Sequence, residues 1–233
     1  MPDASRIVEL ITAGGICAIL RVPSPDDLVP VAQAILDGGI NAIEVAVTTP
    51  GVLRALEPTR AKLGRDVLVG VGTVFTADEA REAIRVGAQF LAAPNFNPDV
   101  LRVGLERGVA IMAGALTPTE IIRAWDAGAN LVRLFPAAPA GPAYVRDLQG
   151  SLPYIPLIPS GGITLDSVTD FIRAGAAAVG VGDALASREL VARRDFREIT
   201  ARAREFVEAV ARARGRTERP VPAVKPIEGP DTR

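Results

Sequence analysis

The chain of 233 residues contains no histidine, a single cysteine and very little lysine. The absence of histidine excludes Ser-His-Asp and Cys-His catalysis, histidine-ligated metal sites, and imidazole as an acid or base. Lys62 and Lys225 are the only lysines, so nearly all of the 26 basic residues are arginines. General acid–base chemistry must therefore rest on carboxylates, hydroxyls, water or one of these two lysines.

The single cysteine, Cys17, cannot form an internal disulfide, and its apolar surroundings predict a buried thiol in a reducing cytoplasm. No apolar run approaches about 18 residues, which excludes a membrane-spanning helix, and residues 1–9 do not resemble a signal peptide. The formal charge of −1 gives no electrostatic basis for binding nucleic acid or an anionic membrane. We therefore expect a cytoplasmic protein with neither kind of partner.

Short apolar runs recur along the chain, and each is followed by a longer amphipathic stretch. The runs do not alternate with polar residues, which is typical of strands buried on both faces of a parallel sheet. There are eight of them, at residues 16–22, 42–47, 67–71, 90–93, 109–113, 131–135, 155–158 and 177–181. Eight strand–helix units in about 190 residues predict an α/β protein with a single-domain (β/α)8 TIM barrel.

The ends of the predicted helices carry recognisable signals. Capping boxes begin at Thr76 and Thr117, Ser24 is followed by proline, and glycines such as Gly87 and Gly128 end helices before the next strand. A doubly wound open sheet is the alternative, but no Gly-x-Gly-x-x-Gly follows the first run. We expect the barrel to span residues 1–214 and the proline-rich residues 215–233 to form a flexible tail.

Two charged residues lie inside apolar strands, and in this fold reacting groups stand at the carboxyl ends of strands. Glu44 is either a general acid/base in the barrel mouth or a buried partner of Arg21 or Arg133. Arg133 either grips a substrate carboxylate or forms an internal ion pair with Glu44 or Asp183.

Further candidates lie where strands end. Thr73 either donates a hydroxyl to a ligand or caps the next turn, and residues 48–51, which include Thr48, form a ligand loop or a helix start. The loops after the seventh and eighth strands are the usual phosphate cradle of this fold. Here they contain Ser160, Gly161, Gly162, Gly182 and Asp183. The Asp183 carboxylate opposes a phosphate dianion and favours a substrate without one.

Several of these segments occur together in the order that one family shows. They are Ile43-Glu44-Val45, Gly70-Val71-Gly72-Thr73-Val74, Ala93-Pro94, Leu116-Thr117-Pro118, Leu134-Phe135-Pro136-Ala137 and Ser160-Gly161-Gly162-Ile163. Over residues 5–210 the chain resembles the 2-keto-3-deoxy-6-phosphogluconate aldolase / 4-hydroxy-2-oxoglutarate aldolase family. The resemblance implies a homotrimeric class I aldolase that releases pyruvate from a 2-keto acid through a lysine Schiff base.

The same resemblance assigns roles to residues of this chain. Glu44 corresponds to the proton-transferring glutamate, and Arg21 to an arginine present in part of the family. Thr73, Pro94 and Phe135 correspond to the pyruvate pocket, and Gly161-Gly162 to the phosphate loop.

Arg133 occupies the position of the Schiff-base lysine, Ser160 provides no substitute on the next strand, and Asp183 replaces a phosphate-binding serine. A guanidinium cannot form the imine that makes a lysine a nucleophilic catalyst. Lys62 falls near the end of a helix, at the rim opposite the site, and Lys225 falls in the tail.

Three hypotheses follow from these features. The first is an aldolase in which Arg133 holds the carboxylate or polarises the enolate oxygen while Glu44 moves the proton. It needs no cofactor, although a divalent metal held by Glu44 and Asp183 is an option. The second is a catalytically silent family member that binds a small acidic metabolite or acts as an oligomeric scaffold. The third is a decarboxylase or isomerase that works through an enolate.

Overall fold

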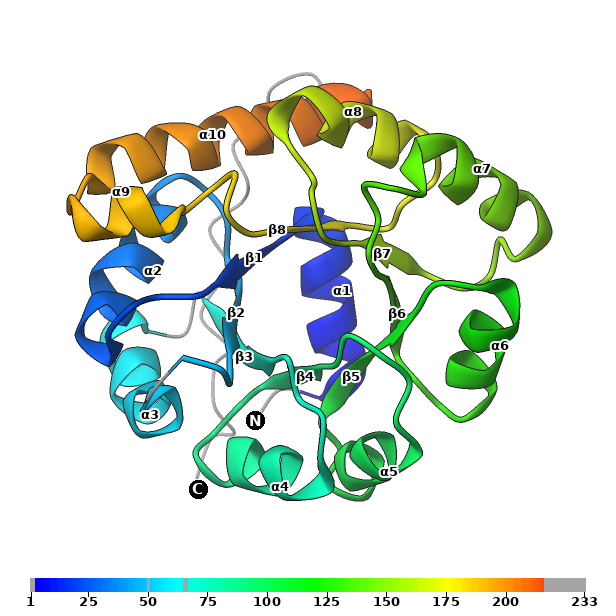
Figure 1. Cartoon of the computed structure of the whole chain (residues 1–233), viewed down its shortest axis with the longest axis horizontal. Helices are drawn as coiled ribbons and strands as arrows, with labels where there is room; N and C mark the ends of the chain where they lie inside the picture. Colours follow the sequence, from blue (N-terminus) through cyan, green and yellow to red (C-terminus); the bar gives the residue numbers. More distant parts are fainter. Residues whose placement is uncertain (1–2, 50, 65–66, 216–233) are drawn as a thin grey trace, which may run out of the picture.

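The computed structural model describes residues 3–49, 51–64 and 67–215, and these residues form a barrel of parallel strands surrounded by helices (Figure 1). Eight strands alternate with the helices along the chain, as the apolar runs predict. The strands are β1 (Ile16–Leu20), β2 (Ala42–Ala46), β3 (Leu68–Gly72), β4 (Phe90–Ala92), β5 (Ala110–Ala115), β6 (Leu131–Leu134), β7 (Leu157–Pro159) and β8 (Val179–Val181).

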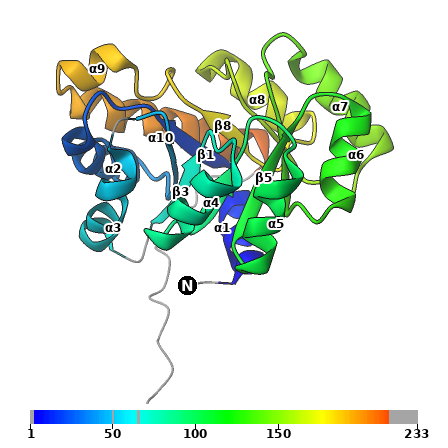
Figure 2. The same ribbon diagram turned by 60° about the horizontal axis from the view of Figure 1, so that its bottom comes forward.

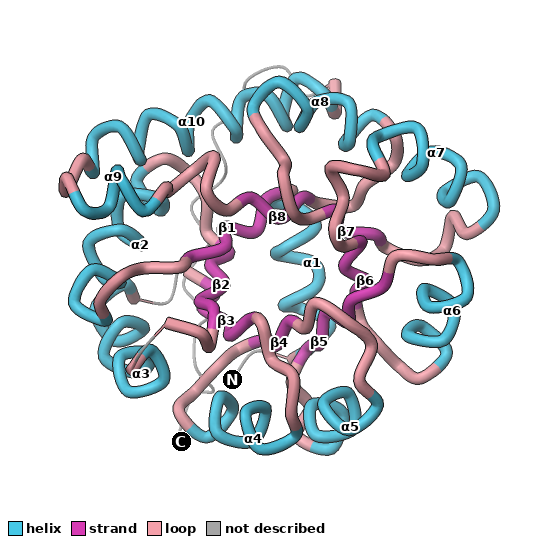
Figure 3. The backbone as a smooth tube through the Cα atoms, in the orientation of Figure 1, coloured by secondary structure: helices cyan, strands magenta, loops and turns pink. Residues whose placement is uncertain are grey.

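The strands pair in sequence order from β1 to β7, and β8 pairs with β1, all in parallel. An isolated parallel bridge between Ser160 and Gly180 joins the β7 end to β8 and completes the ring that Figure 3 shows. The (β/α)8 barrel is thereby confirmed, and the open doubly wound alternative is wrong.

All the helices except the first lie outside the ring of strands (Figure 3). The helices are α1 (Ala4–Gly14), α2 (Leu28–Asp37), α3 (Val52–Leu63), α4 (Ala77–Arg85), α5 (Pro98–Glu106), α6 (Pro118–Asp126), α7 (Gly141–Ser151), α8 (Leu165–Arg173), α9 (Arg188–Ala192) and α10 (Phe196–Ala213).

The predicted capping boxes are confirmed. Thr76 accepts a hydrogen bond from the Glu79 amide at 3.2 Å, and the Glu79 carboxylate accepts one from the Thr76 amide at 3.0 Å. Thr117 and Glu120 repeat this arrangement at the start of α6. At Ser24 a 3₁₀ turn, Pro25–Asp27, comes first and α2 begins after it. None of the helices in the described part of the chain is long and apolar enough to cross a bilayer.

Helix α1 closes the amino-terminal end of the barrel, an element that the apolar runs did not reveal. It leads directly into β1 and lies across the base of the strand ring (Figures 1 and 2). Its Ile7 and Ile11 are fully buried and pack against the inward-facing residues of the strands. These residues, the barrel core, are Cys17, Ala42, Leu68, Phe90, Ala92, Ala110, Met112, Leu131, Ile158 and Ala178. With this end plugged, a ligand can enter only at the carboxyl end of the strands, the barrel mouth.

Candidate active site

Glu44 of β2 and Arg133 of β6 form an ion pair across the barrel interior. Arg133 Nη1 donates a hydrogen bond to Glu44 Oε1 at 3.0 Å, and Nη2 donates a second to Oε2. Glu44 is 0% exposed and Arg133 is 5% exposed. The sequence allowed either a role in catalysis or substrate binding or an internal ion pair for these residues, and the structure shows the ion pair. Its partners are Glu44 and Arg133, and not Arg21 or Asp183.

Strand register shows which side of the pair faces the mouth. Glu44 is level with Gly70 of β3, and Glu44 Oε1 reaches the space that a side chain on Gly72, two residues nearer the mouth, would fill. Oε2 instead lies 4.0 Å from the sulfur of Cys17, which is deeper in the barrel. Oε1 and Nη1 are thus the atoms on the mouth side.

The deeper edge of the guanidinium contacts Met112 of β5. The Met112 sulfur lies 3.3 Å from Nε and 3.2 Å from Nη2 of Arg133. A guanidinium has five N–H groups, and four of them are accounted for by these two contacts and by the two hydrogen bonds to Glu44. One N–H on Nη1 is left for a ligand, next to the carboxylate oxygen Oε1.

Glu44, Arg133 and Cys17 form a buried cluster in which each group affects the protonation of its neighbours. Burial by itself lowers the pKa of the Arg133 guanidinium, but the charge and hydrogen bonds of Glu44 raise that pKa overall, so the group stays cationic. Burial, together with the Glu44 charge, raises the pKa of the Cys17 thiol well above its usual range, against a smaller opposing effect of Arg133. The thiol therefore stays protonated and is no nucleophile, which confirms the prediction of a buried cysteine.

Glycines make room for this cluster. A Cβ on Gly72 would collide with the Glu44 carboxylate, and a Cβ on Gly180 would collide with the Ser160 hydroxyl. Ser160 is 1% exposed, and its hydroxyl lies 3.4 Å from the Ile158 carbonyl oxygen. It therefore packs against β8 within the barrel wall, beneath the loop that was expected to bind a phosphate.

Thr73 and Pro94 follow β3 and β4 at the mouth. Thr73 is half-buried with φ at 62°, a strained conformation for a β-branched residue, and strain of this kind concentrates at functional sites. The side chain that caps α4 is that of Thr76, so the alternative role of Thr73 as a cap is wrong. Backbone atoms of Pro94 fill the space left by Gly114.

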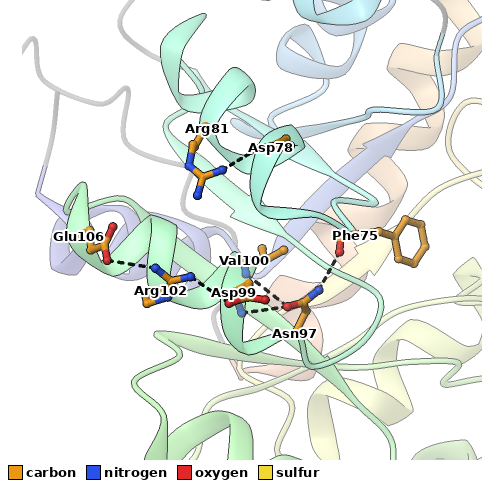
Figure 4. Close-up of polar contacts among 8 residues, drawn as sticks. All are labelled: Phe75, Asp78, Arg81, Asn97, Asp99, Val100, Arg102 and Glu106. Atoms are coloured by element: carbon orange, nitrogen blue, oxygen red, sulfur yellow. Dashed lines mark hydrogen bonds and ion pairs between the residues drawn. The ribbon is translucent and has the colours of Figure 1, made fainter.

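The loops that carry these two residues are tied together (Figure 4). Asn97 caps α5 through its side-chain oxygen Oδ1, which accepts a hydrogen bond from the Asp99 backbone amide at 2.9 Å. Its Nδ2 group donates to the Phe75 carbonyl oxygen at 2.7 Å. The β3–α4 and β4–α5 loops are thus fixed relative to each other, which holds Thr73 and Pro94 on a rigid rim.

The other predicted residues lie on the remaining rim. Phe135 is 37% exposed, with its ring against Gly161, and Gly161 and Gly162 have positive φ values of 89° and 78° that favour glycine. A guanidinium nitrogen of Arg21, Nη1, lies 3.6 Å from where a Cβ on Gly182 would be.

Thr48 and Asp183 are exposed. Thr48 lies in a turn ahead of α3, which begins at Val52, and its role as a ligand residue stays a prediction. Lys62 is exposed in the last turn of α3, and Lys225 lies outside the described residues.

The residues around Glu44 do not fit a resident divalent metal. Hard cations need several oxygen ligands, whereas both Glu44 oxygens already accept from a cation, and the other close side chains offer sulfur. Within the described ranges, no three Cys, Asp or Glu side chains gather to form a metal site. Asp183 is exposed while Glu44 is fully buried, so the proposed Glu44–Asp183 metal pair receives no support.

A family model for aldolases, described as KDPG and KHG aldolase, matches residues 7–202. The chain belongs to this family. It is 31% identical over 205 residues to the 2-dehydro-3-deoxy-phosphogluconate aldolase of Treponema pallidum, covering 88% of this chain and 97% of the relative. It is 30% identical over 194 residues to the 2-dehydro-3-deoxy-6-phosphogalactonate aldolase of Escherichia coli, covering 83% and 95%.

Solved structures agree with the family assignment. A native KDPGal structure superposes with a TM-score of 0.80 at 29% identity and covers 86% of this chain and 96% of that one. The KDPG aldolase of Legionella pneumophila, with pyruvate captured as a covalent carbinolamine, has a TM-score of 0.79 at 25% identity and covers 85% and 97%. The chain is therefore an enzyme of the aldolase class, a lyase of carbohydrate metabolism.

Sequence reasoning missed three residues that shape this candidate site. Met112 is indistinguishable from ordinary core in an apolar strand, and Asn97 is one of several polar loop residues. Gly72 was noted only within a motif. The feature that could have revealed Gly72 is the pair of glycines, Gly70 and Gly72, in a strand next to the one that carries the buried Glu44.

Proposed function

We propose that this protein cleaves a 2-keto acid to pyruvate and an aldehyde by enolate chemistry without a Schiff base. The observation that carries the proposal is the buried Glu44–Arg133 pair, which presents an N–H donor and a carboxylate oxygen side by side toward the mouth. An enolate-forming reaction needs both groups, one to stabilise the developing oxyanion and one to move a proton.

Glu44 and Arg133 are sufficient for every proton transfer and charge in the proposed cleavage. Glu44 accepts the proton of the hydroxyl on C4, and the C3–C4 bond breaks to release the aldehyde. The electron pair of that bond moves into an enolate whose charge, on the C2 oxygen, is stabilised by the remaining Nη1–H of Arg133. Glu44 then returns the proton to C3, which gives pyruvate and restores the ion pair.

A covalent route has no nucleophile in the described interior. A carbinolamine such as the one captured in the Legionella pneumophila enzyme forms from an amine, and the guanidinium of Arg133 stays cationic. Lys62 is on the outer helical layer, at the last turn of α3.

The substrate class follows from the family, with one difference at the rim. The relatives are named for phosphorylated sugar acids, and the positive-φ glycines Gly161 and Gly162 are compatible with an anion there. The exposed Asp183 carboxylate, just past Gly182, opposes a dianion. We therefore propose a substrate without phosphate, of the 4-hydroxy-2-oxoglutarate type, with Arg21 near its distal carboxylate.

Two measurements test this function. Pyruvate methyl protons should exchange in D₂O when the protein is present, and Glu44→Gln should abolish the exchange. Cleavage of 4-hydroxy-2-oxoglutarate should exceed that of 2-keto-3-deoxy-6-phosphogluconate, and the reverse order would reject the substrate proposal. If neither exchange nor cleavage occurs with or without Mg²⁺ or Mn²⁺, the protein is a silent binder of a small acid.

The assembly and location are proposed from the family. One structural neighbour, with a TM-score of 0.80 at 29% identity, is a cage designed by fusing symmetric oligomeric domains, and the match covers 86% of this chain and 73% of that one. This supports an oligomer, and we propose a homotrimer in the cytoplasm. Light scattering during size-exclusion chromatography gives the subunit number directly.

A further inference from the structure

Met112 is a buried side chain that contacts Arg133 and that the proposed reaction does not use. Its sulfur accepts from Nε and Nη2, which together form one edge of the guanidinium. Glu44 occupies the neighbouring edge through Nη1 and Nη2. The planar guanidinium is thus hydrogen-bonded along two edges, and both Met112 and Glu44 determine its orientation.

We propose that Met112 is a positioning residue, which holds Arg133 so that its last N–H points toward the barrel mouth. This inference rests on the proposed function for its kinetic consequence but not for the contact itself. Met112 pairs with Leu131, whereas Arg133 is level with Gly114, so the backbone of Met112 lies two residues deeper in the barrel than that of Arg133. A contact from that side occupies the deeper edge and leaves the mouth-facing N–H for a ligand.

The chemistry of sulfur suits this role. A thioether is apolar enough to be buried without cost, and it is still a weak hydrogen-bond acceptor for an N–H that would otherwise be unsatisfied. A carboxylate or amide oxygen at this position would compete with Glu44 for the guanidinium. A hydrocarbon side chain would leave the Nε–H without an acceptor, and that group would turn to find another one.

The kinetic test is Met112→Leu, a replacement of similar volume that costs little in core packing. We expect the maximal rate of pyruvate methyl exchange to fall about tenfold, because a misdirected N–H stabilises the enolate less well. The dissociation constant for pyruvate should change less than about twofold, since the charge of Arg133 and its pairing with Glu44 persist. A side chain with only a packing role would change stability and leave the rate per folded molecule unaltered.

Two matched proteins control for packing and for the acceptor. Leu131→Met makes the reciprocal exchange at the paired position on β6. Leucine has no hydrogen-bond acceptor to offer the guanidinium, so the rate of this variant should stay at the wild-type value. Selenomethionine labelling replaces only Met1 and Met112 and preserves an acceptor, so this protein should also keep the wild-type rate.

The contact has its own test, which is independent of activity. The selenium NMR resonance of residue 112 should shift clearly between the labelled wild-type chain and the labelled Glu44→Leu/Arg133→Leu variant, which adds no further methionine. In that variant both charges are replaced by apolar groups, an exchange that often preserves folding. An unchanged resonance would overturn the inference whatever the activity.

The outcomes separate the two proposals. A selenium shift without any pyruvate exchange would reject the proposed function and leave the contact in place. Exchange in the wild type with an unaltered rate in Met112→Leu would reject the positioning role alone.

Discussion

Glu44 and Arg133, 89 residues apart in the sequence, meet across the barrel interior through two hydrogen bonds between carboxylate and guanidinium. Each side chain comes from a strand that is otherwise apolar, and each is at most 5% exposed. Two opposite charges so deeply buried are stable only together, because the loss of one leaves the other without a counterion. The pair is therefore a structural element, and in the reaction that we propose it is also the chemical centre of the site.

Breaking the pair should destabilise the protein more than removing it. Glu44→Gln leaves a buried cation and should lower the free energy of unfolding by about 3–5 kcal/mol. Glu44→Leu/Arg133→Met removes both charges and should stay near the wild-type value. Urea unfolding of the three proteins measures this, and equal losses in both variants would show that the charges do not depend on each other.

Arg133→Lys should give the protein a nucleophile in place of its guanidinium. An amine at this position can form an imine with pyruvate, and borohydride then reduces that imine to a stable adduct. Mass spectrometry should detect one added pyruvate unit in the variant. Failure to trap an adduct in a folded variant would mean that the rest of the pocket cannot hold pyruvate near residue 133.

Gly72→Ala should abolish activity by displacing the Glu44 carboxylate, because its methyl group would occupy the same space as that carboxylate. Gly150→Ala is the matched control. A Cβ at Gly150, within α7, meets nothing within 4 Å, so this variant should retain activity and gain about 0.5–1 kcal/mol of stability. Pyruvate exchange and thermal unfolding of both variants decide the matter, and an active Gly72→Ala protein would contradict the geometry.

Cys17 should make the stability fall at alkaline pH. Burial raises the pKa of its thiol in the folded state, so the unfolded chain loses this proton first as the pH rises. The contribution is fully present below about pH 8.5, the usual thiol pKa, and is lost above it by about 1.4 kcal/mol per pH unit. Urea unfolding at increasing pH should show this fall in the free energy of unfolding for the wild type. In Cys17→Ala the fall per pH unit should be smaller by the contribution of this one thiol. Identical slopes would mean that the thiol titrates normally.

The barrel could be predicted from the sequence because its strands are buried on both faces and therefore form continuous apolar runs. The same logic identified Glu44 and Arg133, since a charge within such a strand has to face the interior. Helix α1 was missed because residues 4–14 mix charged and apolar side chains and precede the first run. The identity of each partner could not be decided, because it depends on which strands stand opposite each other once the ring closes.

The contacts of Met112 and Asn97 were beyond the reach of sequence for a different reason. A methionine in an apolar strand has the same pattern whether its sulfur meets a guanidinium or a methyl group. Asn97 caps a helix, as many asparagines do, and its bond to Phe75 depends on how two loops approach each other. Both are consequences of tertiary packing.

The central claim is that the Glu44–Arg133 pair enolises a 2-keto acid without a covalent bond to it. The most direct test follows pyruvate methyl exchange in D₂O before and after the wild-type protein is treated with borohydride in the presence of pyruvate. We expect exchange at the same rate in both samples, with no gain in protein mass. Loss of exchange together with a pyruvate adduct would contradict the claim.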